Sequence, residues 1–416
     1  MNRKKVVVFG LGKIYKAFVE LYDSSKMDII ALSDNNSRLL DKLKNNNRRV
    51  VIPEKIIELQ FDYVIITSSY FEEIINQLKG YGIKKDNILN FYDLFQRIDN
   101  TEGNLELINL LNISIPLKRD YKQELERILA IEERNLFLNA RNYINFVKNR
   151  NLKSLEEAEF QVFSQFGEDG IIQWLIHNVT IEHKTFVEFG VEDYLEANTR
   201  FLLMNNNWSG FVMDGSKKNI DKLGKWNYLW KYDLTATAAF ITKDNINKLI
   251  KDAGYIGDIG LLSIDLDGND YWILNAIDCV SPRILICEYN SIYGQKEKVC
   301  VPYDENFIRS KAHYSNLYWG ASIAAFRDWA EDNNYYYMGS NNAGNNAFFV
   351  RKDCISIDKI PNNANIFVES KYRESRDRNG KLTYKRGRER LECIKDMQLY
   401  DISTQSLATI EHIYNL

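Results

Sequence analysis

Acidic side chains crowd the region that follows two expected strands, IGLLSI and PRILIC. Asp265, Asp267 and Asp270 follow the first strand, and Glu288 ends the second. The carboxyl ends of parallel strands meet at one edge of a sheet, and crowded carboxylates repel unless a proton, a cation or hydrogen bonds relieve them. Asp267 could therefore act as a general base with Glu288 beside it. Alternatively, Asp267, Asp270 and Glu288 could bind a hard cation such as Mg²⁺.

A histidine offers a competing base. His313 lies in the segment KAHYSN, and histidine titrates near neutrality. A single loop histidine is also typical of a structural or exposed position. The sequence therefore leaves both interpretations of His313 open.

A second pattern indicates a nucleoside ligand. Glu188 lies at the end of the expected strand TFVEF, one residue before Phe189, Gly190 permits a close turn, and Asp214 ends the next strand, GFVMD. A carboxylate in this last place can accept hydrogen bonds from both hydroxyls of a ribose. The single glycine of EFGVEDY cannot cradle a pyrophosphate as GxGxxG does, which favours an adenosine-like ligand over a dinucleotide. Taken singly, each acid could also cap a helix.

The first 40 residues carry a partial dinucleotide fingerprint. Gly10 and Gly12 follow the strand KVVVF, and Asp34 comes directly after the strand IIALS, but Tyr15 stands where the third glycine would lie. The pattern predicts nucleotide or nucleotide-sugar binding by this region. A scaffold for docking or dimerisation is the alternative.

These residues need sheets to position them. Strands and amphipathic helices alternate over residues 5–90 and again from about residue 160, which predicts two doubly wound parallel sheets. The second ends in YYYMGS and AFFVRK, a hairpin that places an antiparallel strand at or beside the sheet edge. The predicted domains are a small Rossmann-like domain (1–95), a helical connector (96–158), a larger α/β domain (159–370) and a C-terminal tail (371–416), which we expect to be helical.

Motifs in the larger domain resemble those of the FkbM-like branch of the class I S-adenosylmethionine-dependent methyltransferases. They are SQFGEDGII, FVEFGVEDYLEANTRFL, MDGS, SIDLDGNDYWIL, ICEYN and GASIAAF, in that order over residues 160–355. The resemblance implies a class I methyltransferase fold and S-adenosylmethionine as cofactor. It assigns cofactor contacts to five positions, Gln165, Glu188, Gly190, Asp214 and Asp265, and places Asp267 near the methyl group and the acceptor.

The first 90 residues resemble the small Rossmann-like domains attached to capsule and lipopolysaccharide biosynthesis enzymes. The enzymes to which such domains are attached imply a sugar or nucleotide-sugar acceptor. We therefore expect an O-methyltransferase that acts on a sugar hydroxyl of a surface polysaccharide or of its nucleotide-linked precursor. The alternatives are an NAD(P)-dependent or nucleotide-sugar-modifying enzyme that uses the first domain, or a non-catalytic scaffold.

Composition narrows the class of protein. The chain has 416 residues, of which 45% are hydrophobic and 27% charged, and a net charge of −3, so it offers no basic field for nucleic acid. No segment has the roughly 20 apolar residues of a membrane span. Five scattered cysteines without a CxxC pair favour a reduced, cytoplasmic protein. The sequence leaves a homo-oligomer open.

Overall fold

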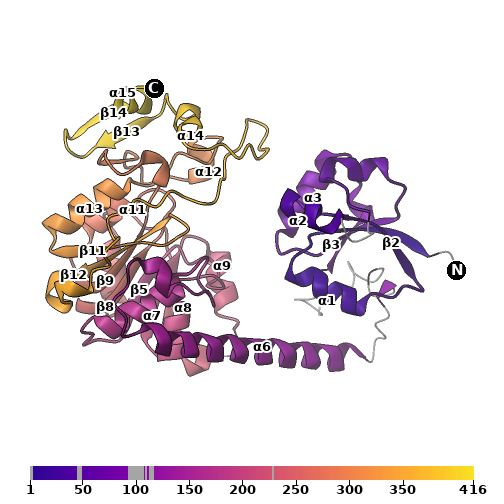
Figure 1. Ribbon diagram of the computed structural model, residues 1–416, viewed down its shortest axis with the longest axis horizontal. Coiled ribbons are helices and arrows are strands. Elements are labelled where there is room, and N and C mark those ends of the chain that lie inside the picture. Colours follow the sequence, from indigo (N-terminus) through magenta and orange to yellow (C-terminus); the bar gives the residue numbers. More distant parts are fainter. Residues whose placement is uncertain (1–2, 45–48, 92–106, 108–109, 112–116, 227–228) are drawn as a thin grey trace. The chain divides into compact units, whose positions relative to one another are not determined.

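The chain forms two compact units. A computed structural model describes residues 3–44, 49–91, 107, 110–111, 117–226 and 229–416. Contacts divide the chain into unit 1, Met1–Glu133, and unit 2, Arg134–Leu416 (Figure 1). The finer boundaries expected near residues 95, 158 and 370 stay predictions.

Unit 1 is built around a four-stranded parallel sheet. Its strands are β1 (Lys4–Phe9), β2 (Met27–Ser33), β3 (Tyr63–Ile66) and β4 (Ile88–Asn90), in the order β2-β1-β3-β4, and its helices are α1 (Lys13–Leu21), α2 (Ser37–Lys44) and α3 (Phe71–Gly80). Successive side chains of a strand point to opposite faces. Phe18 of α1 accordingly packs with Val6 and Val8 on one face, and Ile74 of α3 packs with Val7 on the other.

Unit 2 contains a seven-stranded sheet. Its strands are β5 (Thr185–Phe189), β6 (Ser209–Asp214), β7 (Leu234–Ala238), β8 (Gly257–Ile264), β9 (Val280–Glu288), β11 (Tyr335–Ser340) and β12 (Asn346–Arg351). The order is β11-β12-β9-β8-β5-β6-β7, and β12 is antiparallel to both of its neighbours. The predicted α/β class, with a parallel sheet that ends in an antiparallel hairpin, is confirmed. The polar strand β7, LTATA, escaped prediction because it lies at an edge and pairs only with β6.

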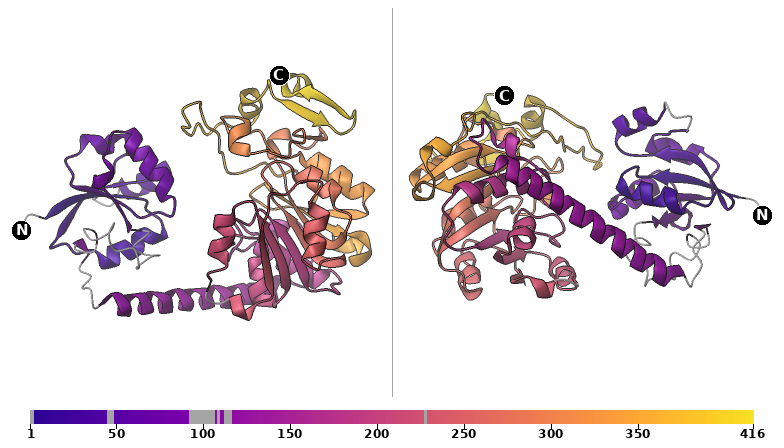
Figure 2. Two further views of the ribbon diagram at one scale, coloured as in Figure 1. Left: turned by 180° about the vertical axis from the view of Figure 1, so that it is seen from behind. Right: turned by 60° about the horizontal axis from the view of Figure 1, so that its bottom comes forward.

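Helices cover both faces of this sheet (Figure 2). They are α7 (Glu168–Asn178) and α8 (Arg200–Asn206) on one face, and α10 (Ile246–Asp252), α11 (Asp270–Ala276) and α13 (Ile323–Asp332) on the other; α9 (Lys217–Leu223) follows β6. The long helix α6 (Leu117–Val147) starts within unit 1, and its residues Ala140 and Ile144 pack with Phe201 of unit 2. Within the predicted connector, α6 is helical over Leu117–Val147, and residues 96–106, 108–109 and 112–116 lie outside the described residues.

The C-terminal region differs from the predicted helical tail. It contains β13 (Gln398–Asp401) and β14 (Ser406–Thr409), which form a three-stranded sheet with β10 (Val299–Cys300), and the short helices α14 (Arg388–Cys393) and α15 (Ile410–Tyr414). The prediction was wrong because four-residue strands give little alternation and their partner β10 lies far away in the sequence. Leu399 and Ile410 anchor the region against Val299 and Tyr293. Among the helices of the described residues, none combines the length and the apolar character that crossing a membrane requires.

Candidate active site

A cavity of about 670 Å³ opens at the carboxyl ends of β5, β6, β8 and β9. The chain runs outward from β5 to β6 and β7, and then returns to place β8 on the other side of β5. This reversal of strand order creates the crevice in which open α/β sheets bind ligands. The volume lies within the usual range for a site that encloses a small organic molecule.

Gly190 allows the loop after β5 to approach the end of β8 closely. Its φ of 73° lies in the left-handed region, and a Cβ atom at this position would lie 1.7 Å from the carbonyl oxygen of Asp265. A larger residue would therefore separate the loop after β5 from the end of β8. The turn expected after Phe189 is present, and its glycine is required by packing.

Glu188 holds the loop that leads into α8. Its side chain is buried, and its carboxylate accepts hydrogen bonds from the backbone N–H groups of Asn198 and Thr199 at 2.9 and 3.1 Å and from the Thr199 hydroxyl. Burial raises the pKa of Glu188 to about 7, although these hydrogen bonds favour the ionised form. Glu188 also lines the cavity, and its predicted contact with the cofactor stays a prediction.

Asp214 organises the next loop while facing the same cavity. One oxygen accepts the N–H of Glu192 at 2.9 Å, and the other accepts the N–H of Ser216 at 2.7 Å and a weak bond from Asn219 Nδ2 at 3.4 Å. A carboxylate has about four lone-pair sites, so a ligand can use the remaining one and, by displacing the weak Asn219 bond, a second. Its predicted role as ribose acceptor stays a prediction.

Apolar side chains on the β7 side of the cavity were missed by the sequence analysis. Phe240 and Ile241 follow β7, and both line the cavity together with Leu266. Phe240 is half exposed at 50%. Recognition of β7 would have exposed this signal, because an apolar pair directly after a strand lies where ligands bind in such sheets.

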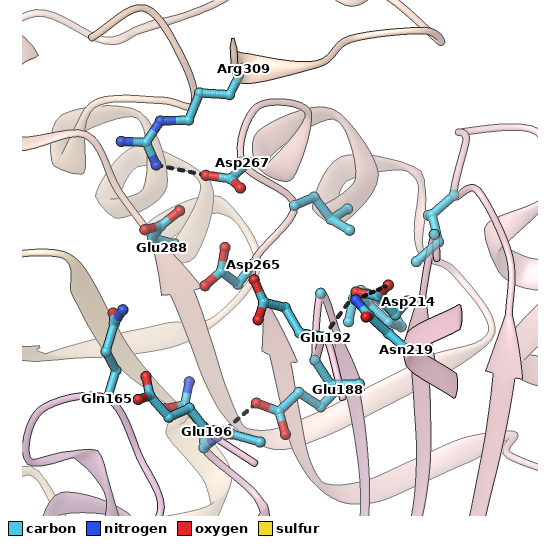
Figure 3. Close-up of a pocket in the computed structure, with 18 of the residues that line it drawn as sticks. Gln165, Glu188, Glu192, Glu196, Asp214, Asn219, Asp265, Asp267, Glu288 and Arg309 are labelled. Carbon is cyan, nitrogen blue, oxygen red and sulfur yellow. Dashed lines mark hydrogen bonds and ion pairs between the residues drawn. The ribbon is translucent and has the colours of Figure 1, made fainter. Parts of the chain in front are cut away.

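Three carboxyl groups converge between the ends of β8 and β9 (Figure 3). Asp265, Asp267 and Glu288 each place an oxygen within 4.8 Å of the others. Burial and the neighbouring acids raise the pKa of Asp265 and of Glu288 well above their usual values. The sequence predicted that these acids, together with Asp270, would lie near one sheet edge. The register explains the convergence of the three, because Ile264 and Cys287 are partners and the next residues of both strands must meet.

Arg309 is a site residue that the sequence did not reveal. It begins the short helix α12 (Arg309–Ala312), and its guanidinium donates to Asp267 Oδ1 at 2.7 Å and to Glu374 Oε2 at 3.2 Å. The guanidinium also lies 4.5 Å from the ring centre of Trp319. Its distance along the chain from Asp267 left no local pattern by which to find it.

Asp270 and His313 do not join the three carboxylates. Asp270 accepts the N–H groups of Leu266 and Gly268 at 2.6 and 2.9 Å, so it closes the turn before α11. His313 forms a 2.7 Å hydrogen bond with Ser315 and is not among the residues that line the cavity. Gln165, by contrast, lines it as expected.

The cavity is strongly acidic. Within its described lining, Arg309 is the one basic side chain, and eight side chains carry carboxylates: Glu188, Glu192, Glu196, Asp214, Asp265, Asp267, Glu288 and Glu374. Negative charge in a partly enclosed site attracts cations and repels phosphates. The cavity therefore suits a ligand with positive charge.

The fingerprint residues of unit 1 have structural tasks. The N–H of Leu11 donates to Asp34 Oδ2 at 2.7 Å. Gly10 has a φ of 96°, and a Cβ atom there would lie 2.9 Å from the Cβ of Ser68. Gly12 precedes α1 with open space around it. The predicted nucleotide binding by these residues stays a prediction.

Comparison with known protein families identifies a similarity at the N-terminus. Residues 2–89 match the family model described as C2185-like, N-terminal. This match lies within unit 1 and covers less than half of the chain. A search of curated proteins finds no significant match to the sequence.

Comparison with solved structures finds S-adenosylmethionine-dependent methyltransferases as structural neighbours. TrmK of M. capricolum, solved with S-adenosylhomocysteine, is 11% identical with a TM-score of 0.25; the match spans 41% of this chain and 62% of TrmK, less than two thirds. A methyltransferase of Clostridium acetobutylicum is 9% identical over 44% of this chain and 90% of its own, with a TM-score of 0.29. The N-terminal domain of EvdMO1, solved in the presence of S-adenosylhomocysteine and D-fucose, is 9% identical over 52% and 94%, with a TM-score of 0.28. Such low values carry no argument about the ligand of this chain.

Proposed function

We propose that unit 2 transfers a methyl group from S-adenosylmethionine to a hydroxyl oxygen. The observation that carries this proposal is the acidic cavity at the switch point of the seven-stranded sheet. S-adenosylmethionine has a positively charged sulfonium and a positively charged ammonium group, which the surrounding carboxylates would attract. The motif order over residues 160–355 supports the FkbM-like branch of these enzymes.

The donor would lie along the β5–β6 side of the cavity. Asp214 would accept hydrogen bonds from the ribose hydroxyls, while Phe240, Ile241 and Leu266 provide an apolar surface for the adenine ring. The methionine part would extend past Gly190 towards Gln165. Its sulfonium would then face the three carboxylates at the ends of β8 and β9.

The reaction is a displacement at the methyl carbon. The acceptor oxygen forms a bond to that carbon as the carbon–sulfur bond breaks, and the bonding pair remains on sulfur, which leaves neutral S-adenosylhomocysteine. The acceptor proton must pass to a base within hydrogen-bond reach. Asp267 is our candidate because its side chain is 59% exposed, whereas the Glu288 residue is only 6% exposed. His313 lies outside the cavity lining and is the weaker candidate.

The acceptor is proposed to be a sugar hydroxyl of a surface polysaccharide or of its precursor. Carboxylates and amides such as Gln165, Glu196 and Asn346 line the cavity, and they can satisfy several hydroxyl groups at once. The same acidic lining would repel a phosphate. In a nucleotide-linked precursor the diphosphate would therefore remain outside, and only the sugar would enter.

Calorimetry with S-adenosylmethionine, S-adenosylhomocysteine and NAD⁺ tests the proposal. We expect the first two to bind with one site per chain and NAD⁺ to leave this site unaffected. Binding of NAD⁺ alone would overturn the proposal and favour an oxidoreductase that uses unit 1. Binding of none of the three to a folded chain would favour a scaffold.

A further inference from the structure

The three converging carboxylates lie where two strand ends meet. Asp265 and Asp267 follow β8, and Glu288 ends β9, whose residue Cys287 is in register with Ile264. Their oxygens lie at most 4.8 Å apart, so side-chain shifts of less than about 1 Å bring all three to the roughly 2.1 Å at which Mg²⁺ contacts oxygen. Figure 3 shows the three carboxyl groups turned towards one another.

One carboxylate oxygen in this group lacks a partner. Glu288 Oε2 is buried and accepts no hydrogen bond from any described residue, and the whole residue is 6% exposed. A buried polar atom without a partner costs free energy, and the cost is larger for a charged group. The Glu288 carboxyl group faces Asp265 and Asp267, so a positive partner for this oxygen would lie beside the three residues.

A second acidic group in unit 2 provides a contrast. Glu182, His183 and Asp258 also lie within 4.8 Å of one another, but arginines neutralise their carboxylates. Arg283 pairs with Glu182 at 2.9 Å and with Asp258 at 2.8 Å, and Arg351 pairs with Asp258 at 2.8 Å.

The three carboxyl groups of the cavity, on Asp265, Asp267 and Glu288, have far less positive charge beside them. Arg309 contacts Asp267 at 2.7 Å and is shared with Glu374 at 3.2 Å. No ion pair to a described residue reaches Asp265 or Glu288. These three carboxyl groups therefore have one shared arginine, and two of the three form no ion pair with a described residue.

We infer that Asp265, Asp267 and Glu288 bind one divalent cation of the Mg²⁺ or Mn²⁺ type. Three carboxylate oxygens from two rigid strand ends are hard ligands, which favour these ions over Zn²⁺. Three ligands leave positions of an octahedral ion for water and for hydroxyl oxygens of the acceptor. Binding of the cation follows from the site alone, whereas its use in catalysis rests on the proposed methyl transfer.

Manganese titration of the full chain tests the inference without activity. After chelator treatment, the electron paramagnetic resonance of free Mn²⁺ should show one bound ion per chain in the absence of donor and acceptor. Glu288→Gln should weaken this binding at least about tenfold. Asp267→Asn should also weaken it, and this residue is exposed enough for the variant to fold if the buried substitution does not.

Glu374→Gln is the matched control. It removes the same charge from the same cavity, but Glu374 does not belong to the converging group, so Mn²⁺ affinity should change by less than about threefold at ordinary ionic strength. An equal loss in this variant would show general electrostatic attraction and overturn the inference. Absence of Mn²⁺ binding to the folded chain would also overturn it, and would favour a proton shared between Asp265 and Glu288.

Donor titration of the same sample separates the two proposals. Binding of S-adenosylmethionine without Mn²⁺ binding would overturn the cation site and leave the proposed function intact. Binding of Mn²⁺ without binding of S-adenosylmethionine would support the cation site and overturn the proposed function. Each proposal can therefore fail without the other.

Discussion

The two units use the same loop hydrogen bonds after their first two strands. In unit 1, Asp34 accepts the N–H of Leu11 at 2.7 Å and that of Asn36 at 2.8 Å. In unit 2, Asp214 accepts the N–H of Glu192 at 2.9 Å and that of Ser216 at 2.7 Å. In both cases the acid at the end of the second strand ties down the loop that follows the first strand. The pattern that suggests a ribose acceptor is therefore also a structural device.

The units differ across the switch point. In unit 1, Thr67 and Ser68 follow β3, and the Thr67 hydroxyl donates to the carbonyl of Gly10, so small side chains pack directly against the glycine. In unit 2, the residues after β8 and β9 are carboxylates around a cavity. The acid and the glycine that both units share thus indicate only a common loop geometry. The residues across the crevice differ: small side chains fill it in unit 1, whereas carboxylates surround a cavity in unit 2.

Replacement of Asp267, which lies after β8 on the side of the crevice where the two units differ, should have the largest effect on activity. Asp267→Asn keeps the shape of the side chain but removes a base or a cation ligand, so we expect turnover to fall by about 10² to 10⁴. Donor affinity should be preserved, because Asp267 lies on the acceptor side. Methyl transfer from labelled S-adenosylmethionine to a panel of sugars measures both quantities. Full turnover in this variant would remove Asp267 from either role and return attention to His313.

Replacement of the acid at the end of the second strand of each unit should have a smaller effect, and it should lower donor affinity in unit 2 only. Asp214→Ala removes contacts to two ribose hydroxyls, each worth about 1.5 to 3 kcal/mol, so donor affinity should fall at least about tenfold. Asp34→Ala is the matched change in unit 1 and should leave donor affinity unchanged. Calorimetry provides the values. Equal affinities in the two variants would contradict the assignment of the donor to unit 2.

Sequence patterns predicted the parts of the site that are local in the chain. Apolar runs that stop at or beside an acid predict the strand ends near Glu188, Asp214 and Glu288, and Gly190 predicts the turn after Phe189. Arg309 could not be predicted in the same way, because only tertiary structure brings it to Asp267.

Other failures have equally physical causes. Asp270 lies only three residues after Asp267 and was predicted as a metal ligand, yet backbone N–H groups occupy its carboxylate. The hairpin at residues 398–409 was missed because its partner strand β10 is remote. Short strands whose partners are remote in the sequence are therefore harder to predict than the strands of the central sheet.

The buried acids of unit 2 predict a pH effect on stability. Burial raises the pKa of Asp169 to about 6 and that of Glu188 to about 7. A raised pKa in the folded state means stability that is fully present below the unfolded-state pKa, near 4, and is lost as pH rises through about 6 to 7. Unfolding of unit 2 should therefore cost roughly 1 to 2 kcal/mol more at pH 6 than at pH 8.

Tryptophan fluorescence isolates this measurement. All seven tryptophans, from Trp174 to Trp329, lie in unit 2, so their signal during urea unfolding reports on that unit alone. A transition that moves to higher urea as pH falls from 8 to 6 would agree with the prediction. Lower stability at pH 6 would show that buried Asp169 and Glu188 are not held in the protonated form.

Removal of unit 1 should have the smallest effect on donor binding. A chain that begins at residue 134 retains the part of α6 that packs on unit 2, including Phe137, Ala140 and Ile144, so the apolar contacts beneath α8 are preserved. Every residue that lines the cavity lies beyond residue 160. The dissociation constant for S-adenosylmethionine should therefore change by less than about threefold, or about 0.6 kcal/mol. The fluorescence of the seven tryptophans shows whether the shortened chain is folded. Loss of donor binding by a folded chain would mean that unit 1 contributes to the donor site, and the division of labour between the two sheets would have to be redrawn.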